Sequence, residues 1–273
     1  MIEYEIKPKS KFSINLRELW EYRELFYIFT WRDIKIKYKQ TILGFLWAIL
    51  QPFLMMVVFT VFFDKMLHVP TDQNIPYPIF VFAGLMLWNI FSNGLTGAAN
   101  SMLSNANIIK KIYFPRLIIP FSAILIPLFD FLVSFIIYIG LLIYYHFAIS
   151  WIIIVYLPLS LLLTVMSSFG LGAFIAAVNV KYRDFKYIVP FAIQLLLFLT
   201  PVIYSISIAK AVWLQELLSL NPMMGAIHLM RCCITGTTAD LVLVMKSTIG
   251  SVILFFFGIY YFQKTEYYFA DLA

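Results

Sequence analysis

Of the 273 residues in the chain, 62% are hydrophobic and only 12% are charged. A soluble globular domain carries about 25% charged residues, so the composition excludes such a domain and indicates an integral membrane protein. The apolar runs are long and do not alternate with polar residues, which predicts transmembrane helices and argues against the strands of a barrel. We therefore expect an all-α membrane protein.

Residues 1–41 are predicted to form a cytoplasmic tail followed by an amphipathic interface helix. Apolar residues recur at helical spacing from Phe12 to Phe26, and charged residues such as Glu18 and Glu21 fall mostly between them. A helix with two such faces lies flat at a membrane surface or against a partner subunit. The alternative is a helix that packs on a soluble face of its own chain.

Residues 42–262 are predicted to form a permease domain of six transmembrane helices, followed by a short cytoplasmic tail at 263–273. The expected spans cover residues 42–63, 79–99, 117–145, 151–178, 187–204 and 242–262. Two amphipathic pieces, at 210–219 and 223–234, are too short to cross a bilayer. We expect them to be short outer-side helices that are re-entrant or interfacial.

The distribution of basic residues predicts the orientation of the chain. Six spans place both termini on one side of the membrane. All but four of the 20 lysines and arginines fall in segments on that side, the exceptions being Lys65, Lys210, Arg231 and Lys246. Because basic residues are concentrated in cytoplasmic loops, both termini are expected to be cytoplasmic. The cations flank membrane spans and form no single soluble face, so a nucleic-acid partner is not expected.

The sequence contains none of the motifs that would supply energy or catalysis. It has no GxxxxGK[ST] phosphate-binding loop and no HExxH, GxSxG or CxxC motif. His68, His146 and His228 lie in separate loops without a ligand spacing, so no metal site is predicted. Asp130 is the only acid deep in a span, where a carboxylate is a functional candidate. Since no second acid accompanies it in the spans, we favour a packed, hydrogen-bonded Asp130 over a proton relay.

Four segments resemble, in order along the chain, the bacterial ABC transporter permeases of the type-2 class that export polysaccharides. These segments are RDIKIKYKQTILGFLW (32–47) followed by Gln51-Pro52, NANIIKKIYFPR (105–116), VKYRDFKYIVPFAIQLLLFLTPVIY (180–204) and Asn221-Pro222-Met223. Within the class, the chain most resembles exporters of O-antigen polysaccharide on a polyprenyl lipid, or of teichoic acid. Capsule exporters are also similar.

The resemblance implies a non-enzymatic membrane subunit of an ATP-driven exporter. Such a permease moves a lipid-linked polysaccharide from the cytoplasmic side across the bacterial inner (plasma) membrane. It works as a homodimer with two copies of a separate cytoplasmic ATPase, which binds ATP and Mg, so no cofactor is expected on this chain.

The sequence also allows two other functional hypotheses. One is an ABC exporter of a capsule, teichoic acid, a drug or a small lipid. The other, from a different class, is a multi-pass membrane glycosyltransferase or acyltransferase. The absence of a clustered acidic or histidine site from the sequence weighs against an enzyme.

A cytoplasmic ATPase must act on rigid elements at the cytoplasmic face of the permease. The residues we assign to this coupling role are Trp20, Arg32, Asp33, Ile108, Ile109, Lys110, Lys111, Phe114, Arg116, Arg183 and Asp184. Ile108, Ile109 and Phe114 are apolar residues in a predicted polar loop. A groove on the ATPase would remove them from water, and burial among lipid head groups is the alternative.

The first span also predicts a substrate path. Phe45, Pro52, Met56, Phe59 and Phe63 fall on one face at 100° per residue. Because aromatic faces stack on flat apolar surfaces such as those of sugar rings, Phe45, Met56, Phe59 and Phe63 are candidates for lining a glycan path. Ordinary packing or lipid contact is the alternative.

Two further patterns concern the outer side and the fourth span. Asn221, Pro222 and Met223, together with the two short outer helices, are candidates for an exit gate. In the fourth span, Gly172 with Ala176 and Ala173 with Ala177 are small residues at four-residue spacing. This spacing predicts close helix packing, either within the chain or between two copies of it.

Overall fold

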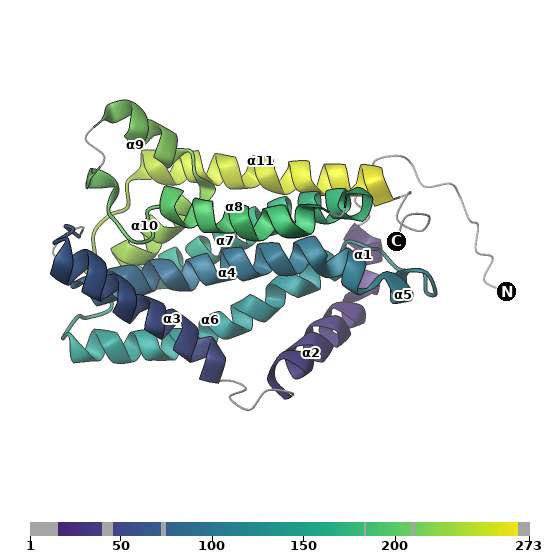
Figure 1. The fold of residues 1–273 in the computed structure, drawn as a ribbon, viewed down its shortest axis with the longest axis horizontal. Helices are drawn as coiled ribbons and strands as arrows, with labels where there is room; N and C mark the ends of the chain where they lie inside the picture. Colours follow the sequence, from purple (N-terminus) through teal and green to yellow (C-terminus); the bar gives the residue numbers. More distant parts are fainter. Residues whose placement is uncertain (1–15, 40–45, 72–74, 183, 209–210, 267–273) are drawn as a thin grey trace.

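The computed structural model of the chain describes residues 16–39, 46–71, 75–182, 184–208 and 211–266. Those residues form helices and connecting loops without any strand, which confirms the predicted all-α class. The longest helices run side by side along one axis (Figure 1). They are α4 (Tyr77–Ser104), α6 (Ile118–Tyr144), α7 (Ile153–Lys181) and α11 (Leu241–Glu266).

Five of the described helices are long and apolar enough to cross a membrane: these four and Leu46–Met66, which comprises α3 (Leu46–Phe59) and the π-helical segment η1 (Thr60–Met66). The predicted fifth span is α8 (Phe185–Leu199), whose 15 residues cover about 22 Å at 1.5 Å per residue. It runs beside α4 along most of the bundle (Figure 1). With α8 as a crossing, the count equals the six that we predicted.

The two short helices before the last span are present as predicted. A 3₁₀ turn, η3 (Ile206–Ile208), leads to α9 (Val212–Ser219), and α10 (Pro222–Thr235) follows. The axes of α9 and α10 meet at 91°, so the pair bends sharply and does not form one straight span. Figure 1 shows α9 projecting from the end of the bundle that is opposite α1 and α5.

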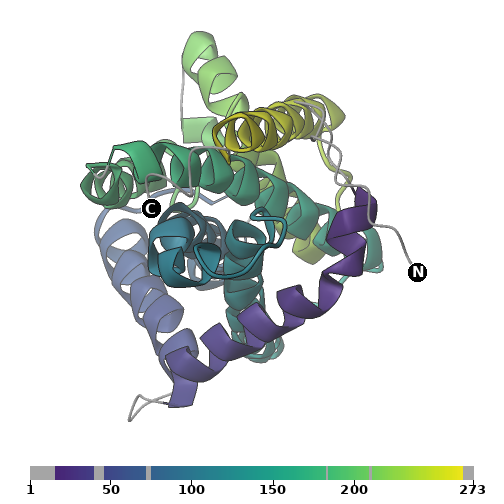
Figure 2. The same ribbon diagram turned by 90° about the vertical axis from the view of Figure 1, so that its right-hand side faces the viewer.

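The N-terminal helical region extends beyond the apolar pattern that runs from Phe12 to Phe26. It comprises α1 (Leu16–Glu21) and α2 (Arg23–Lys39), which continues through the basic segment. Residues 23–39 contain no glycine or proline to stop a helix. Helix α2 crosses one end of the bundle obliquely (Figure 2) and packs against α6, with the rings of Phe26 and Phe121 5.4 Å apart.

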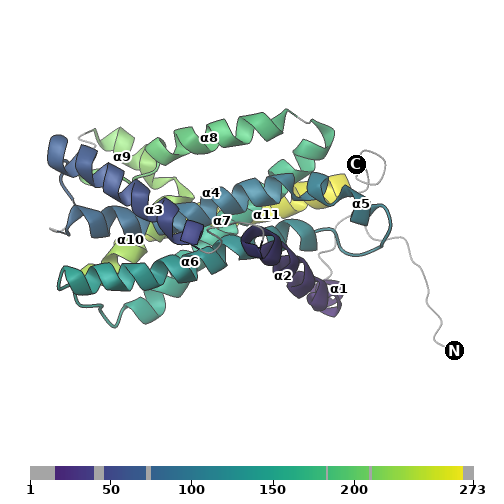
Figure 3. The same ribbon diagram turned by 60° about the horizontal axis from the view of Figure 1, so that its bottom comes forward.

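Helix α4 is the most deeply buried of the spans. Figure 3 shows it surrounded by α3, α6, α7 and α8. Its first half contributes a continuous run of buried residues from Ile79 to Trp88. A helix that is apolar all round is buried on all sides, so α4 is the axis on which the other helices pack.

The small residues of α7 are used within the chain. Ala173, Ala176 and Ala177 are fully buried, and a Cβ added at Gly172 would lie 2.6 Å from the Cβ of Ala98 on α4. On the other face of α7, a Cβ at Gly258 of α11 would overlap the carbonyl oxygen of Gly170. The predicted close packing is therefore between helices of one chain.

Both described ends of the chain lie at the same end of the bundle. Helix α1, the short helix α5 (Ala106–Ile109) and the last turn of α11 are at the right-hand end in Figure 1. The starts of α4 and α11 lie at the opposite end. This arrangement is the one that an even number of crossings requires.

The Gly170–Gly258 crossing provides a direct test of the fold. We expect Gly258→Ala to destabilise the protein by about 1–3 kcal/mol, because the new methyl group meets backbone that cannot move aside. Thermal unfolding of the purified protein in detergent measures the effect. Gly140→Ala on α6 is the control, since a Cβ there meets no atom within 4 Å. Equal melting temperatures for the two variants would contradict the close crossing.

Candidate functional site

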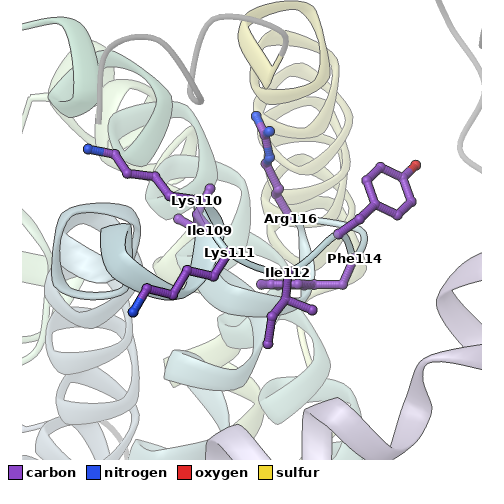
Figure 4. A pocket seen from close by; sticks show the side chains of 7 residues that line it. Ile109, Lys110, Lys111, Ile112, Phe114 and Arg116 are labelled. Carbon is purple, nitrogen blue, oxygen red and sulfur yellow. The ribbon is translucent and has the colours of Figure 1, made fainter.

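The loop from α5 to α6 forms an exposed, cation-rich surface at the end of the bundle. Residues 109–114 and Arg116 surround a hollow of about 200 Å³. Figure 4 shows the side chains of Lys110 and Lys111 extending outward from this loop, whereas Arg116 extends toward α11. The Arg116 guanidinium donates to the carbonyl oxygen of Glu266. A cation at the last turn of α11 is favoured by the helix dipole, so Arg116 anchors the loop.

The structure buries Ile109 and Phe114, two residues that we expected to be exposed for a coupling role. Only 6% of Ile109 and 4% of Phe114 is exposed, and the Phe114 ring lies 5.7 Å from the ring of Phe29 on α2. Their own chain removes these side chains from water, so no partner groove is needed to cover them. Ile108 is half-buried. The exposed apolar residues of the loop are instead Ile112 (62%) and Tyr113 (67%). Figure 4 shows Ile112 in the loop before Phe114.

Arg32 and Asp33 connect α2 to the same loop. The Arg32 Nε donates to Asp33 Oδ1 at 2.8 Å, and its Nη2 donates to Asn105 Oδ1 at 2.9 Å. Asn105 is the residue at which α4 ends and α5 begins. Tyr113 OH also donates to Glu18 Oε1 of α1 at 3.4 Å. Helices α1, α2 and α4 therefore meet at this loop.

The remaining predicted coupling residues are less connected. Trp20 is exposed on α1, with the Arg23 guanidinium 5.5 Å from its ring centroid. Asp184 is exposed at the start of α8. Arg183 lies outside the described residues. We define the coupling face as the exposed residues Trp20, Lys110, Lys111, Ile112 and Tyr113.

The aromatic face of the first span turns into the chain. Met56 and Phe59 are buried and Phe63 is half-buried, with the rings of Phe59 and Phe63 5.8 Å apart. These residues belong to the apolar core that α4 dominates. In the single chain, α3 therefore packs on its neighbours through Met56 and Phe59, and a role of these residues in a glycan path stays a prediction. Phe45 lies outside the described residues.

The predicted gate residues form the start of a helix. Asn221 caps α10, its side chain accepting a hydrogen bond from the Met223 amide at 3.0 Å. The same side chain donates to Thr200 Oγ1 at 2.8 Å, just after α8. Pro222 occupies the first turn of α10, a position that suits proline. Met223 is buried. Asn-Pro-Met thus joins α10 to the end of α8, and a gating role stays a prediction.

Asp130 is hydrogen-bonded, as predicted, but its partners come from α2. Its carboxylate accepts hydrogen bonds from Lys37 Nζ and Tyr38 OH. Burial, followed by the hydrogen bond to Asp130, raises the pKa of Tyr38 above its usual range. The phenol therefore remains protonated and can donate to the carboxylate. The sequence did not indicate this pairing, because Lys37 and Asp130 lie 93 residues apart in the chain.

A polar cavity lies beside this pair, and the sequence analysis did not predict it. Its volume is about 280 Å³, and its walls come from α2, α3, α4 and α6. The polar lining consists of Lys37, Gln51, Asn89, Asn93, Asp130 and Ser134. Two asparagines within an apolar span, Asn89 and Asn93, were the signal in the sequence. What their face of the helix contacts depends on tertiary packing and could not be predicted.

Comparison with known proteins gives concordant matches. The sequence pattern described as "ABC-2 type transporter" matches residues 24–235. The chain is 33% identical over 212 residues to an O-antigen export system permease protein RfbA of Myxococcus xanthus, covering 77% of this chain and 80% of that protein. It is 28% identical to an RfbA of Klebsiella pneumoniae, covering 96% and 98% of the two chains. The polysialic acid transport protein KpsM of Escherichia coli is 25% identical, over 73% of this chain and 77% of that protein.

Two isoleucines of the loop test the division between core and surface. We expect Ile109→Ala to lower the free energy of unfolding by about 2–5 kcal/mol, as for other buried truncations. Ile112→Ala should change it by no more than about 0.5 kcal/mol, because Ile112 is exposed. The measurement is thermal or denaturant unfolding of each variant in the same detergent. A similar loss in both variants would show that Ile112 is also part of the core.

Proposed function

The chain belongs to the ABC-2 type transporter family, and on this premise we propose that it moves a lipid-linked polysaccharide across the bacterial inner membrane, from the cytoplasmic side outward. It is the membrane subunit of a polysaccharide exporter, like its relatives named as O-antigen export permeases. O-antigen or a similar cell-surface glycan is the substrate that these relatives support. A capsular glycan is the second candidate, supported by the relative named as a polysialic acid transport protein.

The observation that carries the proposal is the coupling face. Ile112 and Tyr113 are large and exposed, and Lys110 and Lys111 lie beside them. Exposed apolar residues with a polar rim mark a protein interaction site. We propose that a separate cytoplasmic ATPase, carrying ATP and Mg, docks here through an apolar groove with an acidic edge. This chain then needs no cofactor and catalyses no reaction.

The loop is anchored in a way that suits the transmission of force. Arg116 ties it to the end of α11, Arg32 ties Asn105 to α2, and Tyr113 contacts α1. Movement of a docked ATPase would therefore displace several helices together. We propose that ATP-driven closure of two ATPase subunits tilts these elements and opens a path between two permeases.

Orientation and assembly follow from the same proposal. The coupling face and both described ends of the chain lie at one end of the bundle (Figure 1), so the termini are cytoplasmic if the ATPase docks there. The excess of lysine and arginine in these segments supports that side. We further propose a homodimer, with the lightly packed α8 and the exposed faces of the outer helices available to a second copy or to lipid.

The experiment that tests the function is affinity purification of the chain from its native membrane in mild detergent, followed by mass spectrometry. The expected result is a stoichiometric partner that carries a P-loop. Deletion of the gene should also abolish the surface glycan. Absence of an ATPase after cross-linking, or an unchanged surface glycan, would overturn the proposal.

A single charge placed on the coupling face should separate the two subunits. We expect Ile112→Asp to weaken binding of the ATPase about tenfold or more, the effect of losing roughly 1.4 kcal/mol at a central apolar contact. Recovery of the ATPase with the tagged permease measures binding. Leu67→Asp, also an exposed apolar residue but beyond the other end of the first span, is the control. Full recovery of ATPase with Ile112→Asp would place the docking site elsewhere.

A further inference from the structure

The polar cavity lies about halfway along the bundle. Asp130 is twelve residues beyond Ile118, the start of α6, which corresponds to about 18 Å along the helix. Asn89 and Asn93 are near the middle of α4. The cavity therefore lies between the middle of α4 and α6 and the first turns of α3. Polar side chains of membrane helices normally face a bundle interior or a water-filled space and mark a substrate pathway.

The groups that line the cavity can both donate and accept hydrogen bonds. Gln51 from α3 and the asparagine pair from α4 supply three carboxamides. Each carboxamide has two N–H donors and an acceptor oxygen. The side chains of Gln51 and Asn93 are exposed and that of Asn89 is half-buried. Among the described residues, no protein group forms a hydrogen bond with any of these three amides.

The charges and the aromatic group in the cavity narrow the choice of ligand. Lys37 and Asp130 form an ion pair, so the two charges cancel at this site. A phosphate would meet the Asp130 carboxylate without an excess of cations, which disfavours an anion. Trp47, which is 50% exposed, lines the cavity from α3, the helix that also carries Gln51, and adds an apolar ring. Amides beside an exposed indole complement a neutral sugar, whose hydroxyls form hydrogen bonds and whose C–H face packs on the ring.

We propose that this cavity is a recognition subsite for one neutral sugar residue of the glycan in transit. The inference rests on the proposed function and deepens it, because it assigns the glycan contact to Gln51, Asn89 and Asn93. At about 280 Å³ the cavity is slightly smaller than typical ligand pockets, which measure about 300–1,000 Å³. It therefore holds a single sugar unit and not an oligosaccharide. The half of α4 that carries Asn89 and Asn93, together with Gln51 of α3, lines this part of the path.

Cysteine labelling provides a test, because the two natural cysteines, Cys232 and Cys233, are buried. Asn93→Cys is introduced into the full chain and expressed with its partners. Whole cells are treated with N-ethylmaleimide, which reacts with the thiolate and so requires water at the thiol. The labelling rate is compared between cells that make the lipid-linked glycan and cells in which its synthesis is blocked.

We expect Asn93→Cys to react in cells that lack the glycan and to react at least about twofold more slowly when glycan occupies half or more of the sites. Gln51→Cys, on the facing helix α3, should behave in the same way, and it preserves the test if the first variant does not accumulate. Ile136→Cys is the control, because Ile136 is exposed on α6 but does not line the cavity. Its labelling should be low and independent of the glycan.

Two outcomes would overturn the inference. Equal labelling with and without glycan would identify a hydrated cavity that binds no sugar. No labelling of either cavity variant would show that the cavity is closed to water. The proposed function is judged separately, by the loss of surface glycan when the gene is deleted. If deletion abolishes the glycan but glycan does not protect the thiols, the exporter assignment stands and only the subsite fails.

Discussion

A polar side chain within a bilayer needs a partner, and this requirement determines how the helices of the chain are joined. Water is absent from the hydrocarbon region, so each unsatisfied polar group there costs free energy. In the core, the hydroxyls of Ser167 and Ser251 lie 2.9 Å apart and join α7 to α11. Asn179 donates to the carbonyl oxygen of Ala99 at 3.0 Å and joins α7 to α4.

Arg231 of α10 donates to the Val202 carbonyl at 2.8 Å, and its guanidinium carbon lies 3.4 Å from the centroid of the Phe80 ring. The short helix α10 is thereby held against α4 and the end of α8.

The cavity beside Asp130 differs from these contacts. There the Asp130 carboxylate pairs with Lys37 of α2, but the amides of Asn89 and Asn93 face open space. Closing that space would require only larger apolar side chains on α3 or α6, whereas the sequence places an amide, Gln51, on the facing wall. Gln51 of α3 and the asparagines of α4 thus face one another across this space, an arrangement that suits water or a hydroxylated ligand between them. The same contrast explains why α3 presents Met56 and Phe59 to the core: the apolar face of α3 stabilises the bundle, and its polar residue borders the cavity.

The sequence was sufficient to predict the order of the long spans, since it depends on long apolar runs and their basic flanks. The described residues contain five helices of spanning length, and the predicted fifth span, α8, is shorter. The bent pair α9 and α10 was also predictable, because Asn221-Pro222 interrupts two short amphipathic segments.

Periodicity located the apolar face of α3 but not what that face contacts. Likewise, composition showed that the loop before α6 is unusually apolar, but the separation of Ile109 from Ile112 depends on how the loop folds against α2. The pairing of Lys37 with Asp130 joins residues 93 positions apart, and spacing along the chain carries no information about such a contact.

Helix α2 connects the proposed coupling face to the polar cavity. Arg32 bonds to Asn105 beside the coupling face, and Lys37, five residues later on the same helix, bonds to Asp130 at the cavity. Five residues of a helix span about 7.5 Å, and a hydrogen-bonded helix transmits a displacement without compressing. A force on the loop that moved Asn105 would thus move Lys37 relative to α6 unless the Arg32 contact broke first. The polar lining of the cavity includes Lys37 itself, so such a shift changes the shape and charge of the cavity directly. An N-terminal helix that only rested on the membrane surface would have no such connection, and its basic residues would serve only to orient the chain. Under the proposed function, the contacts of Arg32 and Lys37 would give this segment a second role, in which the nucleotide state of a docked ATPase is linked to the cavity proposed for the substrate.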